Sequence, residues 1–135
     1  MSSNFFMWEP KYQLNVKQMD DEHQTLIKIM NEIYELNTQK KDFNQILTKV
    51  AELARWTDLH FKNEEAYFSS IAYSKAEAHK MIHKELLKKF GEHVETMKST
   101  QKIPESFFMF LKVWLSAHIL GVDTGYAQID KQKAV

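Results

Sequence analysis

Histidine and carboxylate residues recur in this chain at helical spacing, and this pattern constrains the fold more than any other feature of the sequence. Five of the six histidines take part, together with one glutamate and one aspartate. In chain order the seven residues are His23, His60, Glu64, His79, His83, His118 and Asp123. Imidazole and carboxylate groups without any thiolate form a ligand set for iron, zinc, copper or manganese. Seven such groups are more than one ion can use, so the sequence predicts a centre of two metal ions.

The rest of the chain favours helices. Only three glycines and two prolines are present, and residues with high helix propensity are plentiful. Apolar residues that recur every three or four positions predict four helices. These are residues 20–37, a second helix whose inward stripe runs over 46–64, a third opened by a capping box at 74–77, and a fourth with Pro104 in its first turn. We therefore predict an all-α, up-down-up-down four-helix bundle.

The 135 residues are expected to form a single domain with an extended N-terminal arm. Its predicted parts are the arm over residues 1–19, the bundle over 20–126 and a loose tail over 127–135. Trp8 and Tyr12 of the arm are expected to pack onto the bundle. Trp56, Trp114, Phe107 and Phe108 are predicted to be core residues, because no basic stripe accompanies them as in a nucleic-acid stacking platform.

Charge and cysteine content exclude several classes of function. Eighteen basic residues balance eighteen acidic ones, so neither a nucleic acid nor an anionic membrane is indicated as a partner. The absence of cysteine excludes structural zinc fingers and iron–sulfur clusters. No segment has the length of a membrane span or the form of a signal peptide, so we expect no membrane insertion and a cytoplasmic location.

The ligand candidates fall at one level of the predicted bundle. From that level to the opposite end of each helix the interval is 14 residues in all four cases: 37−23, 60−46, 97−83 and 118−104. Alternating helix directions then bring every candidate to the same end of the molecule. His93 lies about 15 Å along the helix axis from His83. We therefore interpret His93 as an ordinary half-buried or helix-end histidine.

Spacing within each motif supports a common centre. Residues four apart on a helix differ by about 40° in direction and roughly 6 Å in rise, so His79 with His83, and His60 with Glu64, can converge. The five-residue step from His118 to Asp123 would aim the carboxylate away. The helix is therefore expected to end, tighten or bulge around Gly121.

Together these motifs resemble the hemerythrin family, most closely its single-domain bacterial members, the bacteriohemerythrins. The resemblance extends from about Trp8 to Tyr126. It is carried by Asp20-Asp-Glu-His23, His60-Phe-Lys-Asn-Glu-Glu65, His79-Lys-Met-Ile-His83 and Trp114-Leu-Ser-Ala-His-Ile-Leu-Gly-Val-Asp-Thr-Gly-Tyr126. It implies two iron ions joined by an oxo or hydroxo bridge, with dioxygen as the ligand.

The resemblance also implies how the ligands divide. Three histidines would hold one iron, two would hold the other, and two carboxylates would bridge: His79, His83 and His118; His23 and His60; Glu64 and Asp123. Counting ligands leaves a vacant position on the iron held by two histidines, where dioxygen would bind. In the family each ferrous ion gives one electron to dioxygen, and release reverses the transfer.

The protein must then keep that position dry and free of donors. By their spacing from the histidines, the residues expected to form the wall of this oxygen pocket are Leu26, Phe61, Leu115 and Ile119. Plain core packing explains each of them, taken singly, equally well. The resemblance to hemerythrins independently places a leucine of the pocket at Leu115.

Reversible oxygen binding for storage or delivery, for instance to an oxygen-using enzyme, is the function that the sequence favours. The protein would then be no enzyme, although weak redox turnover is compatible with such a centre. The alternatives are a di-iron enzyme, either a peroxidase or a nitric oxide reductase, and a sensor of oxygen or iron. A sensor usually carries a fused output domain, for which 135 residues leave no room. A zinc protease is disfavoured because Lys80, not a carboxylate, follows His79.

Overall fold

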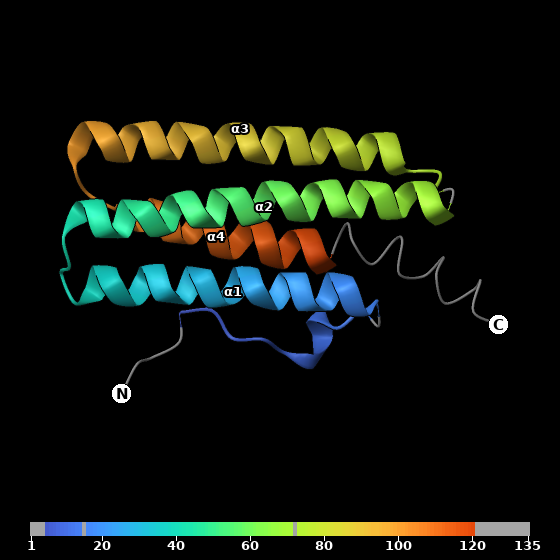
Figure 1. Ribbon diagram of the computed structural model, residues 1–135, viewed down its shortest axis with the longest axis horizontal. Coiled ribbons are helices and arrows are strands. Elements are labelled where there is room, and N and C mark those ends of the chain that lie inside the picture. Colours follow the sequence, from blue (N-terminus) through green and yellow to red (C-terminus); the bar gives the residue numbers. More distant parts are fainter. Residues whose placement is uncertain (1–4, 15, 72, 121–135) are drawn as a thin grey trace.

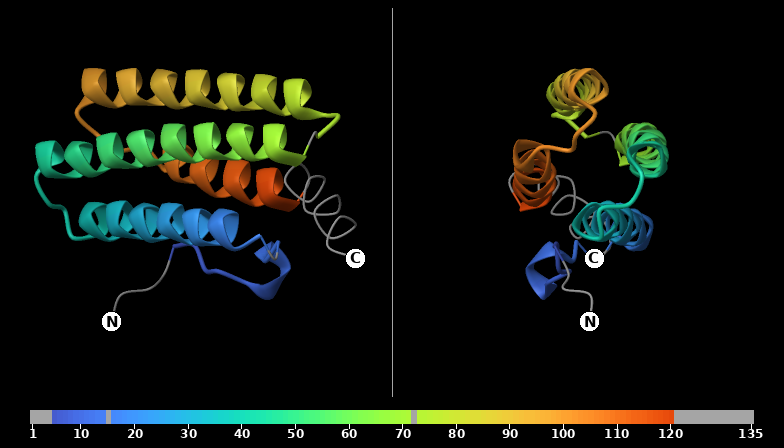
Figure 2. Two further views of the ribbon diagram at one scale, coloured as in Figure 1. Left: turned by 45° about the vertical axis from the view of Figure 1, so that its right-hand side comes forward. Right: turned by 90° about the vertical axis from the view of Figure 1, so that its left-hand side faces the viewer.

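A computed structural model of the chain describes residues 5–14, 16–71 and 73–120, and its regular elements in these ranges are all helices. They are the 3-10 turn η1 (Pro10–Tyr12) and the helices α1 (Lys17–Thr38), α2 (Phe43–Ile71), α3 (Ala76–Thr100) and α4 (Glu105–His118). The helices lie side by side and their connections alternate between the two ends of the molecule (Figure 1). Seen end-on, they surround a common centre (Figure 2). The predicted all-α, up-down-up-down bundle is confirmed.

Three helix starts differ from their predicted positions. α1 begins at Lys17, so it extends three residues (20−17) further than predicted into the segment assigned to the arm. The capping box at Ser74 is not formed: α3 begins at Ala76, and its N-cap is Lys75 without a side-chain cap. A turn closed by the Ala76 amide on the Tyr73 carbonyl occupies this segment instead. Pro104 precedes α4 as an extended N-cap and is not in its first turn.

The N-terminal arm is fixed to the bundle by hydrogen bonds. The side-chain amide of Asn31 accepts from the Phe6 amide at 2.7 Å and donates to the Phe6 carbonyl at 2.8 Å. The Leu14 amide donates to Oδ1 of Asp20 at 2.8 Å. The hydroxyl groups of Tyr12 in the arm and Ser116 in α4 are 3.2 Å apart. The arm therefore connects α1 with α4. Tyr12 is buried in the core and Trp8 packs against that core, as predicted.

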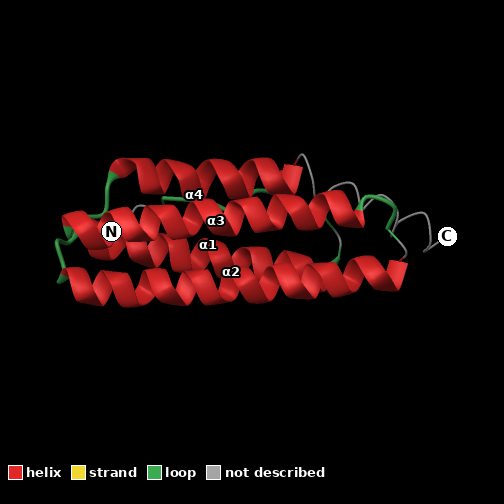
Figure 3. Ribbon diagram, turned by 90° about the horizontal axis from the view of Figure 1, so that it is seen from above, coloured by secondary structure: helices red, strands yellow, loops and turns green. Residues whose placement is uncertain are grey.

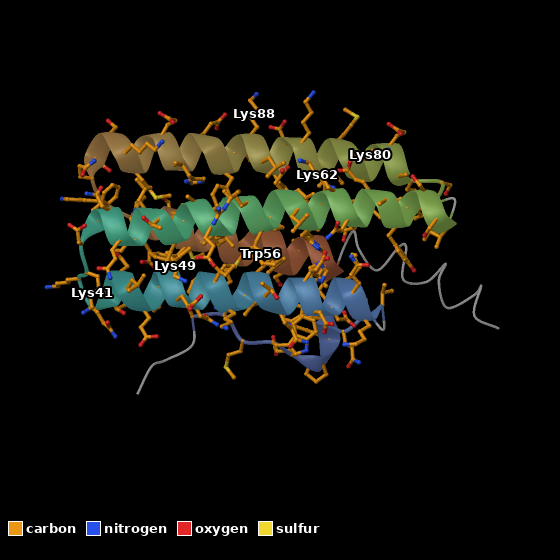
Figure 4. All side chains as sticks on the ribbon, in the orientation of Figure 1. Lys41, Lys49, Trp56, Lys62, Lys80 and Lys88 are labelled. Atoms are coloured by element: carbon orange, nitrogen blue, oxygen red, sulfur yellow. The ribbon has the colours of Figure 1, made fainter. Side chains whose placement is uncertain are left out.

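Apolar side chains fill the bundle along most of its length. Trp114, Phe107 and Phe108 are buried as predicted. Trp56 is not: the residue is 39% exposed, and Figure 4 labels it together with Lys49 and Lys62, which belong to the same helix α2. The inward stripe of α2 passes through Leu53 and Thr57, and Trp56 lies beside that stripe. Viewed from above, the helices run along the long axis of the molecule and short loops join them (Figure 3).

None of the described helices is both long enough and apolar enough to cross a bilayer.

Candidate metal centre

Six of the seven predicted ligand residues meet at one end of the bundle. α1 and α3 begin at this end, and α2 and α4 finish there (Figure 1). The six side chains come from all four helices and are buried: His23, His60, Glu64, His79, His83 and His118. Inward positions that would carry leucine or isoleucine in an ordinary bundle here carry imidazole and carboxylate groups.

The six residues form two groups that share one carboxylate. Glu64, His79, His83 and His118 make up the first group, and His23, His60 and Glu64 the second. In each group one ligand atom per residue can be chosen so that all of these atoms lie within 4.8 Å of one another. This separation is compatible with one metal ion in each group.

The two oxygens of Glu64 face different groups. Oε1 lies 2.7 Å from Nε2 of His83, 3.1 Å from Nε2 of His79 and 3.6 Å from Nε2 of His118. Oε2 lies 3.6 Å from Nε2 of His60. A carboxylate placed in this way can give one oxygen to each of two ions.

Two carboxylates outside these groups contact the far nitrogens of two histidines. Nδ1 of His60 donates to Oε1 of Glu22 at 2.6 Å, and Nδ1 of His83 donates to Oε2 of Glu65 at 3.0 Å. A neutral imidazole whose Nδ1 carries the proton has a lone pair on Nε2, which is the form that binds a metal ion. Both histidines are therefore held with Nε2 towards Glu64.

The convergence of these groups needs a cation. With the Nδ1 proton of His83 directed to Glu65, neutral His83 presents a lone pair to Oε1 of Glu64 at 2.7 Å. Two electron pairs at that distance repel unless a proton or a metal ion lies between them. Nε2 of His60 is also buried, with no hydrogen-bond partner among the described residues. The donor set therefore fits metal ions on chemical grounds.

Electrostatics keep the shared carboxylate ionised. In the metal-free chain protons take the place of the ions between the imidazoles and Glu64. Burial acts to raise the pKa of Glu64, but hydrogen bonds from His118, His79 and His83 and the charge of protonated His60 hold this pKa well below its ordinary value. Glu64 is therefore available as an anionic ligand.

Glu22 is ionised for similar reasons. Burial acts to raise the pKa of Glu22, whereas hydrogen bonds from His60, Gln18 and Asn63 lower it below the ordinary value of a glutamate. The carboxylate therefore remains an acceptor for the Nδ1 proton of His60.

Aromatic rings surround the histidines. The ring of Phe61 stacks on that of His83, with centroids 3.9 Å apart and planes at 3°. It also lies 5.9 Å from the His60 ring and 5.8 Å from the His118 ring. Phe61 thus contacts histidines of both groups. The four residues expected to line an oxygen pocket are all buried: Leu26, Phe61, Leu115 and Ile119.

Two further expectations concern the end of α4 and His93, the histidine outside the predicted ligand set. Asp123 and Gly121 lie outside the described residues, but Ile119 and Leu120 have the wider turn of a π-helix directly before them. This is a change of helix type where one was expected. His93 is half-buried, its ring centroid is 4.7 Å from that of Phe110, and it belongs to neither group of candidate ligands.

Glu22 and Glu65 were not predicted from the sequence to be part of the site. Glu22 directly precedes the candidate ligand His23, and Glu65 directly follows the candidate ligand Glu64. Their partners, however, lie on other helices, 38 and 18 residues away. An acidic residue next to a ligand was the available signal, and it occurs too often on helix surfaces to be decisive.

Known proteins are similar to this chain in sequence and architecture. Residues 14–129 match the family described as the hemerythrin HHE cation binding domain. A bacteriohemerythrin of Clostridium acetobutylicum is 30% identical over 126 residues, covering 90% of this chain and 98% of the relative. A myohemerythrin of Theromyzon tessulatum is 26% identical, covering 90% of each chain. The crystal structure of a hemerythrin mutant superposes with a TM-score of 0.86 at 22% identity, covering 94% of this chain and 98% of the other.

Proposed function

Because the chain belongs to the hemerythrin family, we propose that it binds dioxygen reversibly at a centre of two iron ions. Its role would be oxygen storage or delivery, without catalytic turnover as its main activity. Oxygen binding is supported at the level of the family, and the buried histidine and glutamate cluster is compatible with a di-iron site.

The proposed ligands follow the two groups of side chains. His79, His83 and His118 would hold one iron, and the second would be held by His23 and His60. Glu64 would bridge the two ions. Asp123 is proposed as the second bridging carboxylate on the strength of the sequence motif alone, together with an oxo or hydroxo group from solvent.

The observation that carries this proposal is the placement of Glu64. One of its oxygens faces three imidazole nitrogens, and the other faces the two-histidine side. A site for one ion would not need a carboxylate whose oxygens are directed to two separate groups. With three histidines on one side and two on the other, an ion on the two-histidine side would keep a free coordination position for a small ligand.

When bound, two ferrous ions supply the two electrons that dioxygen accepts on binding and returns on release. The chain's own residues must then exclude water and proton donors from that side of the site. Leu26, Phe61, Leu115 and Ile119 are proposed to do so, since all four are buried and none carries a donor side chain. Outside the lining, Glu22 and Glu65 accept hydrogen bonds from Nδ1 of His60 and His83.

Reversibility is the property to test. The protein would be loaded with ferrous iron, reduced under nitrogen, exposed to oxygen and then returned to vacuum, while its visible absorption is recorded. We expect a coloured adduct that forms with oxygen and disappears under vacuum over repeated cycles. Permanent oxidation after the first exposure would contradict the proposal. Consumption of peroxide or nitric oxide at a sustained rate would favour a di-iron enzyme instead.

A matched pair of histidine variants controls this experiment. His60→Ala removes a proposed ligand, whereas His93→Ala removes a histidine that lies against Phe110 and belongs to neither group. The adduct should be lost or strongly reduced in the first variant and unchanged in the second. Loss in both would indicate that the colour depends on general stability, not on the centre.

Further proposals concern the ligand, a recipient and the location. Dioxygen is the proposed ligand, and an oxygen-using enzyme is the proposed recipient if the protein delivers it. A location in the cytoplasm, a single domain over residues 1–135 and a loose tail over 127–135 stay predictions of the sequence.

A further inference from the structure

We propose that Glu22 is a positioning residue for the two-histidine side of the centre: it fixes the imidazole of His60 so that Nε2 faces the metal. This inference rests on the proposed function for its metal, but the contact itself is a property of the chain. The role is distinct from coordination, because Glu22 is in neither group of candidate ligands.

The contact between Glu22 and His60 is short and crosses between helices. Oε1 of Glu22, on α1, accepts from Nδ1 of His60, on α2, at 2.6 Å. The His60 side chain is 1% exposed and that of Glu22 is 15% exposed. At this depth a charge-assisted hydrogen bond is strong, because little water competes for either partner. It determines both the tautomer of the ring and its rotation about χ2.

Glu22 is itself held in position by its second oxygen. Oε2 accepts from the side-chain amides of Asn63 at 2.8 Å and Gln18 at 3.0 Å. Gln18 lies one turn earlier on α1, and Asn63 lies three residues after His60 on α2. The carboxylate is therefore fixed from both helices, and it cannot rotate away from His60 without breaking two further hydrogen bonds.

The corresponding contact on the other side is weaker. Glu65 accepts from Nδ1 of His83 at 3.0 Å and its side chain is 30% exposed, twice the value for Glu22. That side also has three histidines, and the ring of His83 is fixed by its stacking on Phe61. Loss of one positioning contact should therefore matter more on the His60 side, which has only two histidines.

Three substitutions separate positioning from charge and from folding. Glu22→Leu removes the acceptor for the Nδ1 proton of His60. Glu22→Gln retains an oxygen acceptor without the charge, and the amides of Asn63 and Gln18 can rotate by half a turn to accept from the new amide. Asp21→Asn is the matched control, because it removes a neighbouring charge that pairs with exposed Lys17 and does not touch a histidine.

The first measurement is the release of iron from the loaded full-length protein into an excess of chelator, followed as iron per chain against time. We expect Glu22→Leu to lose one of its two ions roughly 10- to 100-fold faster than the parent, because removing a carboxylate behind a ligand histidine usually weakens metal affinity by about that factor. Glu22→Gln should restore most of the retention, and Asp21→Asn should behave as the parent. Parent-like retention in Glu22→Leu, or equal acceleration in Asp21→Asn, would overturn the proposal.

The second measurement needs no metal. In the ¹⁵N-labelled, metal-free protein at fixed pH, imidazole nitrogen shifts report whether Nδ1 of His60 carries a proton. We expect a protonated Nδ1 in the parent and in Glu22→Gln, and a bare Nδ1 in Glu22→Leu, where the proton moves to Nε2 beside Glu64. A mere contribution to folding would not move that proton, so an unchanged Nδ1 in Glu22→Leu would overturn the inference. If the parent fails to bind two irons, the proposed function fails while this second result still decides the role of Glu22.

Discussion

The two ends of the bundle are built from the same four helices but have different interiors. At the end distant from the candidate ligands, the inward positions are apolar and fully buried: Ile33, Val50, Met97 and Phe107. At the other end the equivalent stripes of the same helices carry His23, His60, His83 and His118, which are buried to the same degree. At the distant end apolar side chains fill the interior by themselves. At the ligand end the imidazole and carboxylate groups bring lone pairs together, and these need a cation between them.

The distant end therefore contributes mainly to the stability of the fold, and the ligand end mainly to the candidate metal centre. Burial of apolar surface stabilises the distant end at about 25 cal/mol for each Å² removed from water. At the ligand end, a buried carboxylate such as Glu64 costs several kcal/mol unless partners offset its desolvation. We therefore expect the ligand end to gain stability from metal and the distant end to be nearly indifferent to it.

Removal of the metal should have the largest effect and should be unequal along the bundle. Each ion contributes about 4 kcal/mol to the free energy of unfolding when free metal is a thousandfold above its Kd. Thermal unfolding should therefore shift to lower temperature after chelation. Hydrogen exchange should show the greatest loss of protection at the amides around His60 and His118, and a smaller loss around Val50. Equal losses at both ends would contradict the division between them.

Substitution of Phe107 by alanine should affect the distant end alone. The ring is fully buried, and its centroid is 5.7 Å from that of Phe90 and 5.9 Å from that of Phe108. Removing it should lower the free energy of unfolding by about 3–5 kcal/mol, because a cavity remains in the core. Denaturant titration measures that loss, and metal analysis of the folded protein should still find two irons per chain. A fall in iron content would show that the two ends are coupled.

The His60→Ala variant should have the opposite effect to Phe107→Ala, because it changes iron binding at the ligand end. It removes a ligand from the side that has only two histidines, so affinity for that ion should fall by at least about a hundredfold, or roughly 2.7 kcal/mol. Iron analysis after gel filtration should approach one ion per chain, with the remaining ion on the three-histidine side. His93→Ala is the control, because this histidine packs against Phe110 and Phe107. A clear loss of iron from the control would show that the site extends further than the two groups.

The level at which the ligands meet was predictable because helix geometry is nearly invariant. A fixed rise per residue and alternating directions place His23, His60, His83 and His118 at one end, whatever the details of packing. The same regularity predicted the four helices from their apolar stripes. It also predicted that α4 changes its turn near Gly121, since a five-residue step cannot keep two side chains on one face.

Features that depend on side-chain rotamers, or on which of two local structures forms at a helix start, were not predictable. The contacts of Glu22 and Glu65 require particular rotamers across helix pairs, which spacing does not encode. Trp56 was expected in the core because no basic stripe accompanies it, yet it lies one residue off the inward stripe and is exposed. Ser74 begins a sequence typical of a capping box, but residues 73–76 form a turn, and α3 begins only at Ala76 after it.

The smallest effect is expected at Leu115, where the apolar lining meets the ligands. Leu115 is fully buried in α4, three residues before His118. Shortening it to alanine opens a cavity that admits water, and water supplies protons that promote irreversible oxidation of the oxygenated protein. We expect autoxidation to be up to about tenfold faster, equivalent to about 1.4 kcal/mol, with unchanged iron content. Leu111→Ala is the matched control, since Leu111 is equally buried on the same helix but one turn further from His118. Both variants lose comparable packing, so equal autoxidation rates at equal iron loading would mean that Leu115 is ordinary core and that other side chains keep the site dry.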